Sequence, residues 1–112
     1  MVDFPININI FVVGARLTTP TAKGIDEEWF AEDIVPLTSN SMRGATIVID
    51  FSYSIPTIVE YTLDGGATFV PFNQGVAVMG GQSRYLRVTS GVQLNFRAKL
   101  AGTLNRAVVG EV

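Results

Sequence analysis

The chain of 112 residues contains no histidine and no cysteine. Without imidazole or thiol groups it cannot build a Ser-His-Asp or Cys-His catalytic set, a His- or Cys-based zinc site, an iron–sulfur cluster or a disulfide framework. Neither of the glycine-rich phosphate-binding motifs, GxGxxG and GxxxxGK[ST], occurs in the sequence. We therefore expect no catalytic residue and no metal or cofactor, and the sequence predicts that the protein is not an enzyme.

Charged residues are also scarce, at 16% of the chain, where a soluble domain usually has about 25%. Apolar residues make up 47%, which argues against disorder and favours a neutral or apolar surface that a partner can cover. The net charge of −2 provides no strong field for nucleic acid or an anionic membrane. No apolar run reaches the ~18 residues of a membrane span, and the beginning of the chain does not look like a signal peptide. We expect synthesis in the cytoplasm and no nucleic-acid or membrane partner.

Strand signals dominate the sequence. In residues 45–55 alternate positions are apolar, and we expect one face to be formed by Ile47, Ile49, Phe51, Tyr53 and Ile55. Residues 92–100 alternate in the same way, with Val92, Leu94, Phe96, Ala98 and Leu100 facing inward and Gln93, Asn95, Arg97 and Lys99 facing outward. Further strands are expected at 5–13, 76–79, 84–89 and 103–109, and around 34–38.

A hairpin is predicted where residues 57–63 and 67–72 flank Asp64-Gly65-Gly66, because a tight turn between strands requires positive φ. Pro71 places the second arm at the edge of a sheet. Turn signals every eight to twelve residues are typical of sandwiches and jelly rolls. The sequence therefore predicts one all-β domain over 1–112, a β-sandwich or jelly roll of about eight short antiparallel strands, with at most one short helical turn near 26–33.

Charges are distributed unevenly along this chain. Residues 1–56 carry three bases and seven acids, whereas residues 57–112 carry five bases and three acids. The acids gather at Asp26, Glu27, Glu28, Glu32 and Asp33, and the bases include Arg84, Arg87, Arg97 and Lys99. Both groups of charges are best interpreted as surfaces that face solvent or a partner. Calcium binding or acid–base catalysis by the acids, or nucleic-acid binding by the bases, is a weaker hypothesis. The two halves suit contacts between unlike surfaces of neighbouring subunits.

Trp29 is the only tryptophan and stands beside Phe30 within the acidic segment. Three roles are open: an anchor in the core, an anchor in an interface rimmed by charge, or, together with Tyr85, a platform for stacking sugars. The residues that we expect at an interface are Trp29, Phe30, Glu27, Glu28, Arg84, Arg87, Arg97 and Lys99.

The C-terminal half carries a resemblance in the stretches IVEYTLDGGATFVPFNQG, RYLRVTSGVQLNFRAKLAG and TLNRAVVGEV. These resemble small structural proteins of tailed bacteriophages, over roughly residues 57–112. The resemblance implies a virion protein of the β-sandwich or jelly-roll type that decorates or cements the capsid. Its partners would be copies of itself, as a homotrimer, and the major capsid protein or another virion protein. A neck, tail or fibre-base component is the alternative within this class, and a carbohydrate-binding β-sandwich is the alternative outside it.

Overall fold

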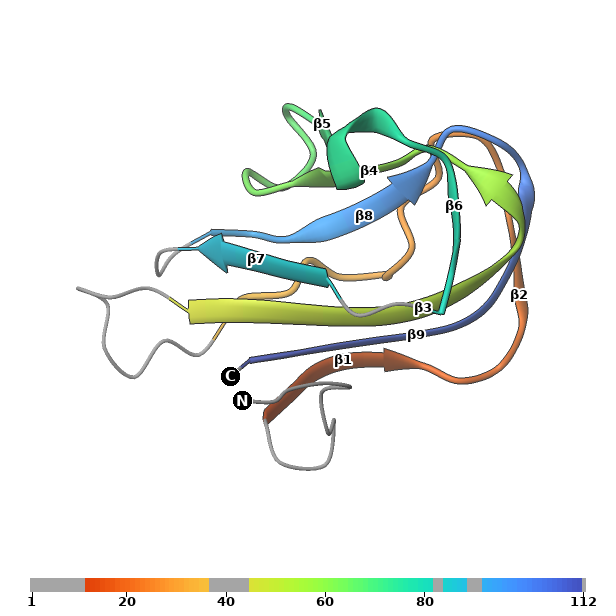
Figure 1. The fold of residues 1–112 in the computed structure, drawn as a ribbon. Helices are drawn as coiled ribbons and strands as arrows, with labels where there is room; N and C mark the ends of the chain where they lie inside the picture. Colours follow the sequence, from red (N-terminus) through yellow and green to blue (C-terminus); the bar gives the residue numbers. More distant parts are fainter. Residues whose placement is uncertain (1–11, 37–44, 82–83, 89–91, 112) are drawn as a thin grey trace, which may run out of the picture.

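The computed structural model describes residues 12–36, 45–81, 84–88 and 92–111. Their regular structure consists of nine strands and one 3-10 turn (Figure 1). The elements are β1 (Val12–Leu17), β2 (Thr21–Lys23), β3 (Ala45–Thr57), β4 (Val59–Thr62), β5 (Val70–Pro71), η2 (Asn73–Gly75), β6 (Val78–Gly80), β7 (Arg84–Val88), β8 (Asn95–Ala98) and β9 (Gly102–Glu111). The predicted all-β domain is confirmed.

The strands form two antiparallel sheets that lie one above the other (Figure 1). In the larger sheet β9 lies between β1 and β3, β2 also pairs with β9, and β6 and β7 both pair with β3. The smaller sheet has the order β5-β4-β8. Two connections, from β3 to β4 and from β8 to β9, pass between the sheets at one end of the sandwich, beside the chain that leaves β2 (Figure 1). These two crossovers shape the surface described below.

The hydrophobic core fills the space between the sheets. Alternation in β3 and around β8 correctly predicts seven buried side chains, Ile47, Ile49, Phe51, Tyr53, Leu94, Phe96 and Ala98, and β9 adds Leu104, Ala107 and Val109. Burying one large apolar side chain stabilises the fold by ~1.5–3 kcal/mol. Apolar packing across the two sheets therefore holds the sandwich together.

The predicted hairpin is present, and its second arm is at an edge. β4 and β5 are antiparallel, with Glu60 opposite Pro71, and β5 is the outer strand of the smaller sheet. Gly65 and Gly66 have φ values of 74° and 98°, the left-handed backbone that the turn requires. Of the other predicted strands, those at 76–79, 84–89 and 103–109 correspond to β6, β7 and β9, and residues 12–13 begin β1. The strand expected around 34–38 is not found at 34–36, where Ile34 forms an isolated bridge with Leu94. Residues 5–11 and 37–38 lie outside the described ranges.

Residues 26–33 form an irregular segment without a helical turn, within the prediction of at most one, and a short 3-10 turn occurs at Asn73–Gly75. Asp26, which a helix would have used as an N-cap, has a φ of 62° and lies in a turn of the backbone. Expectations for three other residues are corrected. Asn95 is buried, although alternation placed it outside. Ile55 and Leu100 were expected inside and are exposed, because both stand where the chain leaves one sheet for the other.

Candidate interaction surface

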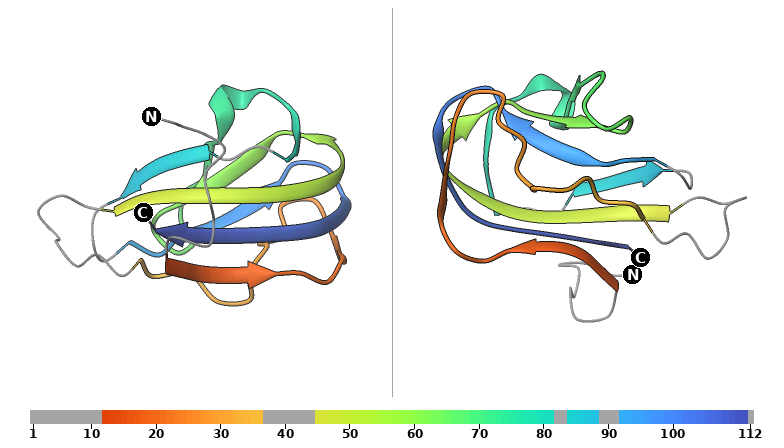
Figure 2. Two further views of the ribbon diagram at one scale, coloured as in Figure 1. Left: turned by 60° about the horizontal axis from the view of Figure 1, so that its bottom comes forward. Right: turned by 180° about the vertical axis from the view of Figure 1, so that it is seen from behind.

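The acidic segment, residues 24–34, runs along the free edge of β8. Four backbone hydrogen bonds join them: Asp26 N–H to Ala98 O (2.9 Å), Trp29 N–H to Phe96 O (2.8 Å), Ile34 N–H to Leu94 O (2.8 Å) and Leu94 N–H to Ile34 O (2.9 Å). Seen from behind, this orange stretch follows β8 between the two layers (Figure 2). The segment thus covers an edge that would otherwise expose unpaired backbone groups.

The buried side chain of Asn95 holds this segment against β8 by hydrogen bonds. Its Oδ1 accepts hydrogen bonds from the N–H groups of Phe30 (3.2 Å) and Phe96 (2.9 Å). Its Nδ2 donates to Phe30 O (3.0 Å), Glu28 Oε1 (3.1 Å) and Asp33 Oδ1 (3.3 Å). The role of Asn95 could not be predicted from the sequence, because alternation along β8 does not reveal that another segment covers its outward side. Glu28 and Asp33 consequently serve to hold the chain in place.

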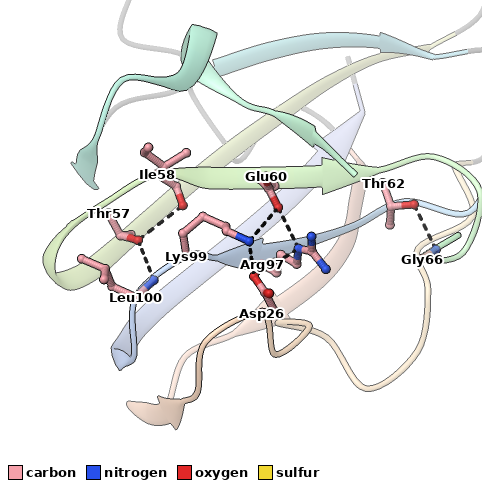
Figure 3. A network of polar contacts seen from close by, with 9 residues as sticks. All are labelled: Asp26, Thr57, Ile58, Glu60, Thr62, Gly66, Arg97, Lys99 and Leu100. Carbon is pink, nitrogen blue, oxygen red and sulfur yellow. Dashed lines mark hydrogen bonds and ion pairs between the residues drawn. The ribbon is translucent and has the colours of Figure 1, made fainter. Parts of the chain in front are cut away.

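Four charged side chains form a network on the outer side of β4 and β8 (Figure 3). Lys99 Nζ lies 2.7 Å from Asp26 Oδ1 and 3.8 Å from Glu60 Oε1. Arg97 Nε lies 2.8 Å from Glu60 Oε1 and 3.6 Å from Asp26 Oδ1, and its guanidinium carbon is 3.7 Å from the centre of the Phe69 ring. The hydrogen bond from Lys99, with the charges of Arg97 and Lys99, lowers the pKa of Asp26 despite some desolvation. Two acids and two bases neutralise one another here.

Glu27 also has a partner within the chain. Its carboxylate lies 3.8 Å from Lys23 Nζ and accepts a hydrogen bond from Gly24 N–H at 2.7 Å. The acid-rich and base-rich parts meet inside one molecule where Asp26 contacts Arg97 and Lys99. The expected contact between unlike surfaces of neighbouring subunits stays a prediction.

Arg84 and Arg87 lie elsewhere, on β7 in the larger sheet. Arg84 is opposite Ile49 in the register with β3, and Arg87 Nη1 donates to Thr46 Oγ1 at 3.2 Å. The structure gathers Glu27, Glu28, Arg97 and Lys99 around the edge of β8 but does not bring these two arginines to them.

Trp29 and Phe30 are core residues. Trp29 is 1% exposed, and its ring centre lies 5.1, 6.2 and 5.8 Å from those of Phe51, Tyr53 and Phe96 respectively. The expectation that Trp29 and Phe30 anchor an interface is therefore wrong. Of the roles left open for Trp29, the structure supports that of an anchor in the core. Because they are buried, Trp29 and Phe30 also cannot stack against sugars. Of the three aromatic residues considered for a carbohydrate site, only Tyr85 is exposed.

The crossovers at the end of the sandwich present a group of exposed apolar side chains, which we call the crossover surface. Hydrogen bonds join the two connections: Tyr53 Oη donates to Leu100 O (2.7 Å), Lys99 N–H to Ile58 O (2.9 Å) and Leu100 N–H to Thr57 Oγ1 (3.2 Å). The surface consists of Ile55, Ile58 and Leu100, which are 37–47% exposed. Ile58 and Leu100 lie at the end of the ion network, next to Lys99 (Figure 3).

This surface presents large apolar side chains to water. Single exposed apolar residues are common, whereas contiguous apolar patches of roughly several hundred Å² often belong to interaction sites. No three potential metal-ligating side chains converge anywhere in the described part of the chain. Within the same ranges, no helix is long and apolar enough to cross a membrane. Comparison with protein-family models, curated proteins and solved structures finds no match for the chain.

Proposed function

We propose that the chain is a virion structural protein, a capsid decoration or cement subunit that stabilises a bacteriophage head through protein–protein contacts. The observation that carries the proposal is the crossover surface, where large apolar side chains are exposed beside charges that already have partners. The likeness of residues 57–112 to small phage structural proteins supplies the kind of particle. A sequence without histidine or cysteine is consistent with a molecule that acts by binding.

Such a subunit would act by mass action. A protein that binds only the assembled shell stabilises it by RT ln(1 + [L]/Kd), which is about 2.7 kcal/mol per site at a hundredfold excess over Kd. Because a shell repeats the same site many times, modest contacts add up to resistance against internal pressure. The sandwich suits this role, since its apolar core is closed between the two sheets.

The alternatives differ in what they require. A neck, tail or fibre-base component would use the same contacts in fewer copies, so copy number separates it from a decoration subunit. A carbohydrate-binding module needs exposed, coplanar aromatic rings, and the burial of Trp29 and Phe30 leaves the proposed interaction with protein as the better-supported reading.

The test is the copy number of the chain in purified particles of the phage that encodes it, measured by quantitative mass spectrometry. We expect hundreds of copies per particle, as symmetric shells repeat each site. About a dozen copies or fewer, as in a symmetric ring, would point to a neck or tail component instead. Absence from the particle contradicts the proposal, whatever the chain binds in isolation.

A further inference from the structure

The turn between β4 and β5 contains a chemically reactive pair of residues, Asp64 followed by Gly65. No other aspartate or asparagine in the chain precedes a glycine. Glycine has no side chain beside its backbone nitrogen, which can therefore approach the carboxyl carbon of the preceding aspartate. We propose that Asp64 is a site of isoaspartate formation, and that the hydrogen bonds it accepts from Thr62 and Thr68 suppress this reaction in the folded chain.

The reaction has two steps and needs only water. The Gly65 nitrogen bonds to the side-chain carboxyl carbon of Asp64, and the amide proton leaves with the hydroxyl of the carboxyl group as water. Water then opens the resulting succinimide ring at the original main-chain carbonyl, so that the main chain passes through the side chain. The product has the same mass as the starting chain, but its main chain is longer by one carbon. Such chemistry is independent of what the protein binds.

The first obstacle in the folded chain is the orientation of the carboxylate, which three hydrogen bonds hold. Asp64 Oδ1 accepts from Thr62 Oγ1 (2.7 Å) and Thr68 N–H (2.9 Å), and Oδ2 accepts from Thr68 Oγ1 (2.6 Å). Attack requires the carboxyl group to turn its face to the Gly65 nitrogen, and these bonds restrict that rotation. The bonds from Thr68 and Thr62 also keep the pKa of the carboxyl well below its ordinary value. Less of the neutral acid, the form that has a hydroxyl to lose, is then present.

The second obstacle is the attacking nitrogen. Gly65 N–H donates to Gln93 O at 3.1 Å, and Gln93 N–H donates to Leu63 O at 3.0 Å. The amide must lose its proton to act as a nucleophile, and a proton held in a hydrogen bond becomes available only when that bond opens. The carboxylate and the nitrogen are thus both bonded to other parts of the chain.

These hydrogen bonds, and not burial, provide the protection. Asp64 and Gly65 are both exposed, so water and hydroxide reach them in the folded chain. The rate of isoaspartate formation should therefore depend on how often the hydrogen bonds of the turn open. Local opening of this kind costs less free energy than unfolding of the whole chain.

The experiment measures isoaspartate at residue 64 by electron-transfer fragmentation mass spectrometry during prolonged incubation of the full chain at neutral pH. We expect the chain unfolded in guanidinium chloride to react at least about tenfold faster than the folded chain. Thr68→Val loses the bond to Asp64 Oδ2 and should react about fivefold faster than the wild type when folded. Thr68→Ser keeps the hydroxyl and should stay within about twofold of the wild type.

A control variant separates opening of the turn from unfolding of the whole chain. Gly102→Ala introduces a Cβ 2.7 Å from Tyr53 Cε2, at the crossovers beyond the opposite end of β4, and so destabilises the fold away from the turn. The isoaspartate rate of this variant should stay within about twofold of that of the folded wild type. Circular dichroism checks that every variant is folded, and Thr68→Ala replaces Thr68→Val if the valine variant is not.

Three results would overturn the inference. The first is an unfolded chain that forms isoaspartate at residue 64 no faster than the folded chain. The second is a Thr68→Ser variant as reactive as Thr68→Val, and the third is a Gly102→Ala variant that accelerates the reaction as much as Thr68→Val does. None of these measurements bears on the copy number of the chain in a particle, so the two proposals are tested independently.

Discussion

The two ends of β4 are built in opposite ways. At its C-terminal end, the turn over residues 62–68 is polar and internally bonded: Thr62 Oγ1 accepts from Gly66 N–H at 2.9 Å, and Asp64 accepts from Thr68 N–H and Oγ1 at 2.9 and 2.6 Å. At the N-terminal end, Ile58 and the neighbouring Leu100 expose apolar side chains to water. The polar groups at the C-terminal end of β4 form hydrogen bonds with one another, whereas the N-terminal end leaves an apolar surface that another molecule can cover.

This difference distinguishes residues that stabilise the fold from residues that are available to bind a partner. Substitutions beneath the crossovers or within the polar turn should act on the free energy of unfolding. Substitutions of the exposed residues on the crossovers should act on association. The following experiments test that division.

The largest effect is expected beneath the crossover surface, at Gly102. A Cβ at this position would lie 2.7 Å from Tyr53 Cε2 and 2.9 Å from Ser54 Oγ, closer than van der Waals contact allows. Gly102→Ala should therefore lower the free energy of unfolding by about 2–3 kcal/mol, measured by urea denaturation. Ala101→Ser, at the exposed neighbouring residue, is the control and should be close to neutral. Equal effects at the two positions would show that the crossovers are not tightly packed.

A smaller effect is expected in the polar turn, at Thr62. Its buried hydroxyl accepts from the N–H groups of Gly66 (2.9 Å) and Asp64 (3.2 Å) and donates to the Asp64 carboxylate (2.7 Å). Thr62→Val keeps the shape but leaves these groups unpaired, which should cost ~1–2 kcal/mol of unfolding free energy. Thr62→Ser retains the hydroxyl and should recover most of the loss. A serine variant as unstable as the valine variant would mean that the methyl group matters, not the hydrogen bonds.

The smallest effect is a dependence on pH at Asp64. Hydrogen bonds from Thr68 and Thr62 hold the pKa of this carboxyl well below its ordinary value. A folded pKa below the unfolded one gives stability that is complete above the unfolded value, about 3.9, and is lost as pH falls through the folded value. The stability difference between wild type and Asp64→Asn should accordingly be largest above about pH 5 and shrink towards pH 2. Urea denaturation at stepped pH measures it, and a constant difference would rule out this role of the ionised carboxylate.

Much of the fold follows from local pattern. Alternation gave the inward faces of β3 and β8, and Asp64-Gly65 gave the hairpin, because both depend on neighbours within a few residues. The pattern failed at Ile55 and Leu100. Alternation identifies which face of a strand a residue occupies, but not where the opposing sheet ends, and both residues stand past that boundary.

Less of the site could be predicted. The sequence singled out Glu27, Glu28, Arg97 and Lys99, and the structure places all four around the edge of β8. The sequence did not indicate that Asp26 and Glu60 complete the ion network with Arg97 and Lys99. These ion pairs join residues 37 and 73 positions apart and depend on tertiary folding. The sequence also left Trp29 undecided between core and interface, because an aromatic residue in an irregular segment carries no periodicity.

The buried position of the one tryptophan has an optical consequence. An indole enclosed by Phe51, Tyr53 and Phe96, whose Nε1–H donates no hydrogen bond, is shielded from water and fluoresces at shorter wavelengths than one in solvent. The fluorescence of Trp29 therefore reports on the packing between the sheets, because this residue is buried away from the outer surface where a partner would bind. Opening of the interior changes the colour of the emitted light, whereas contacts made at the exterior leave that colour alone.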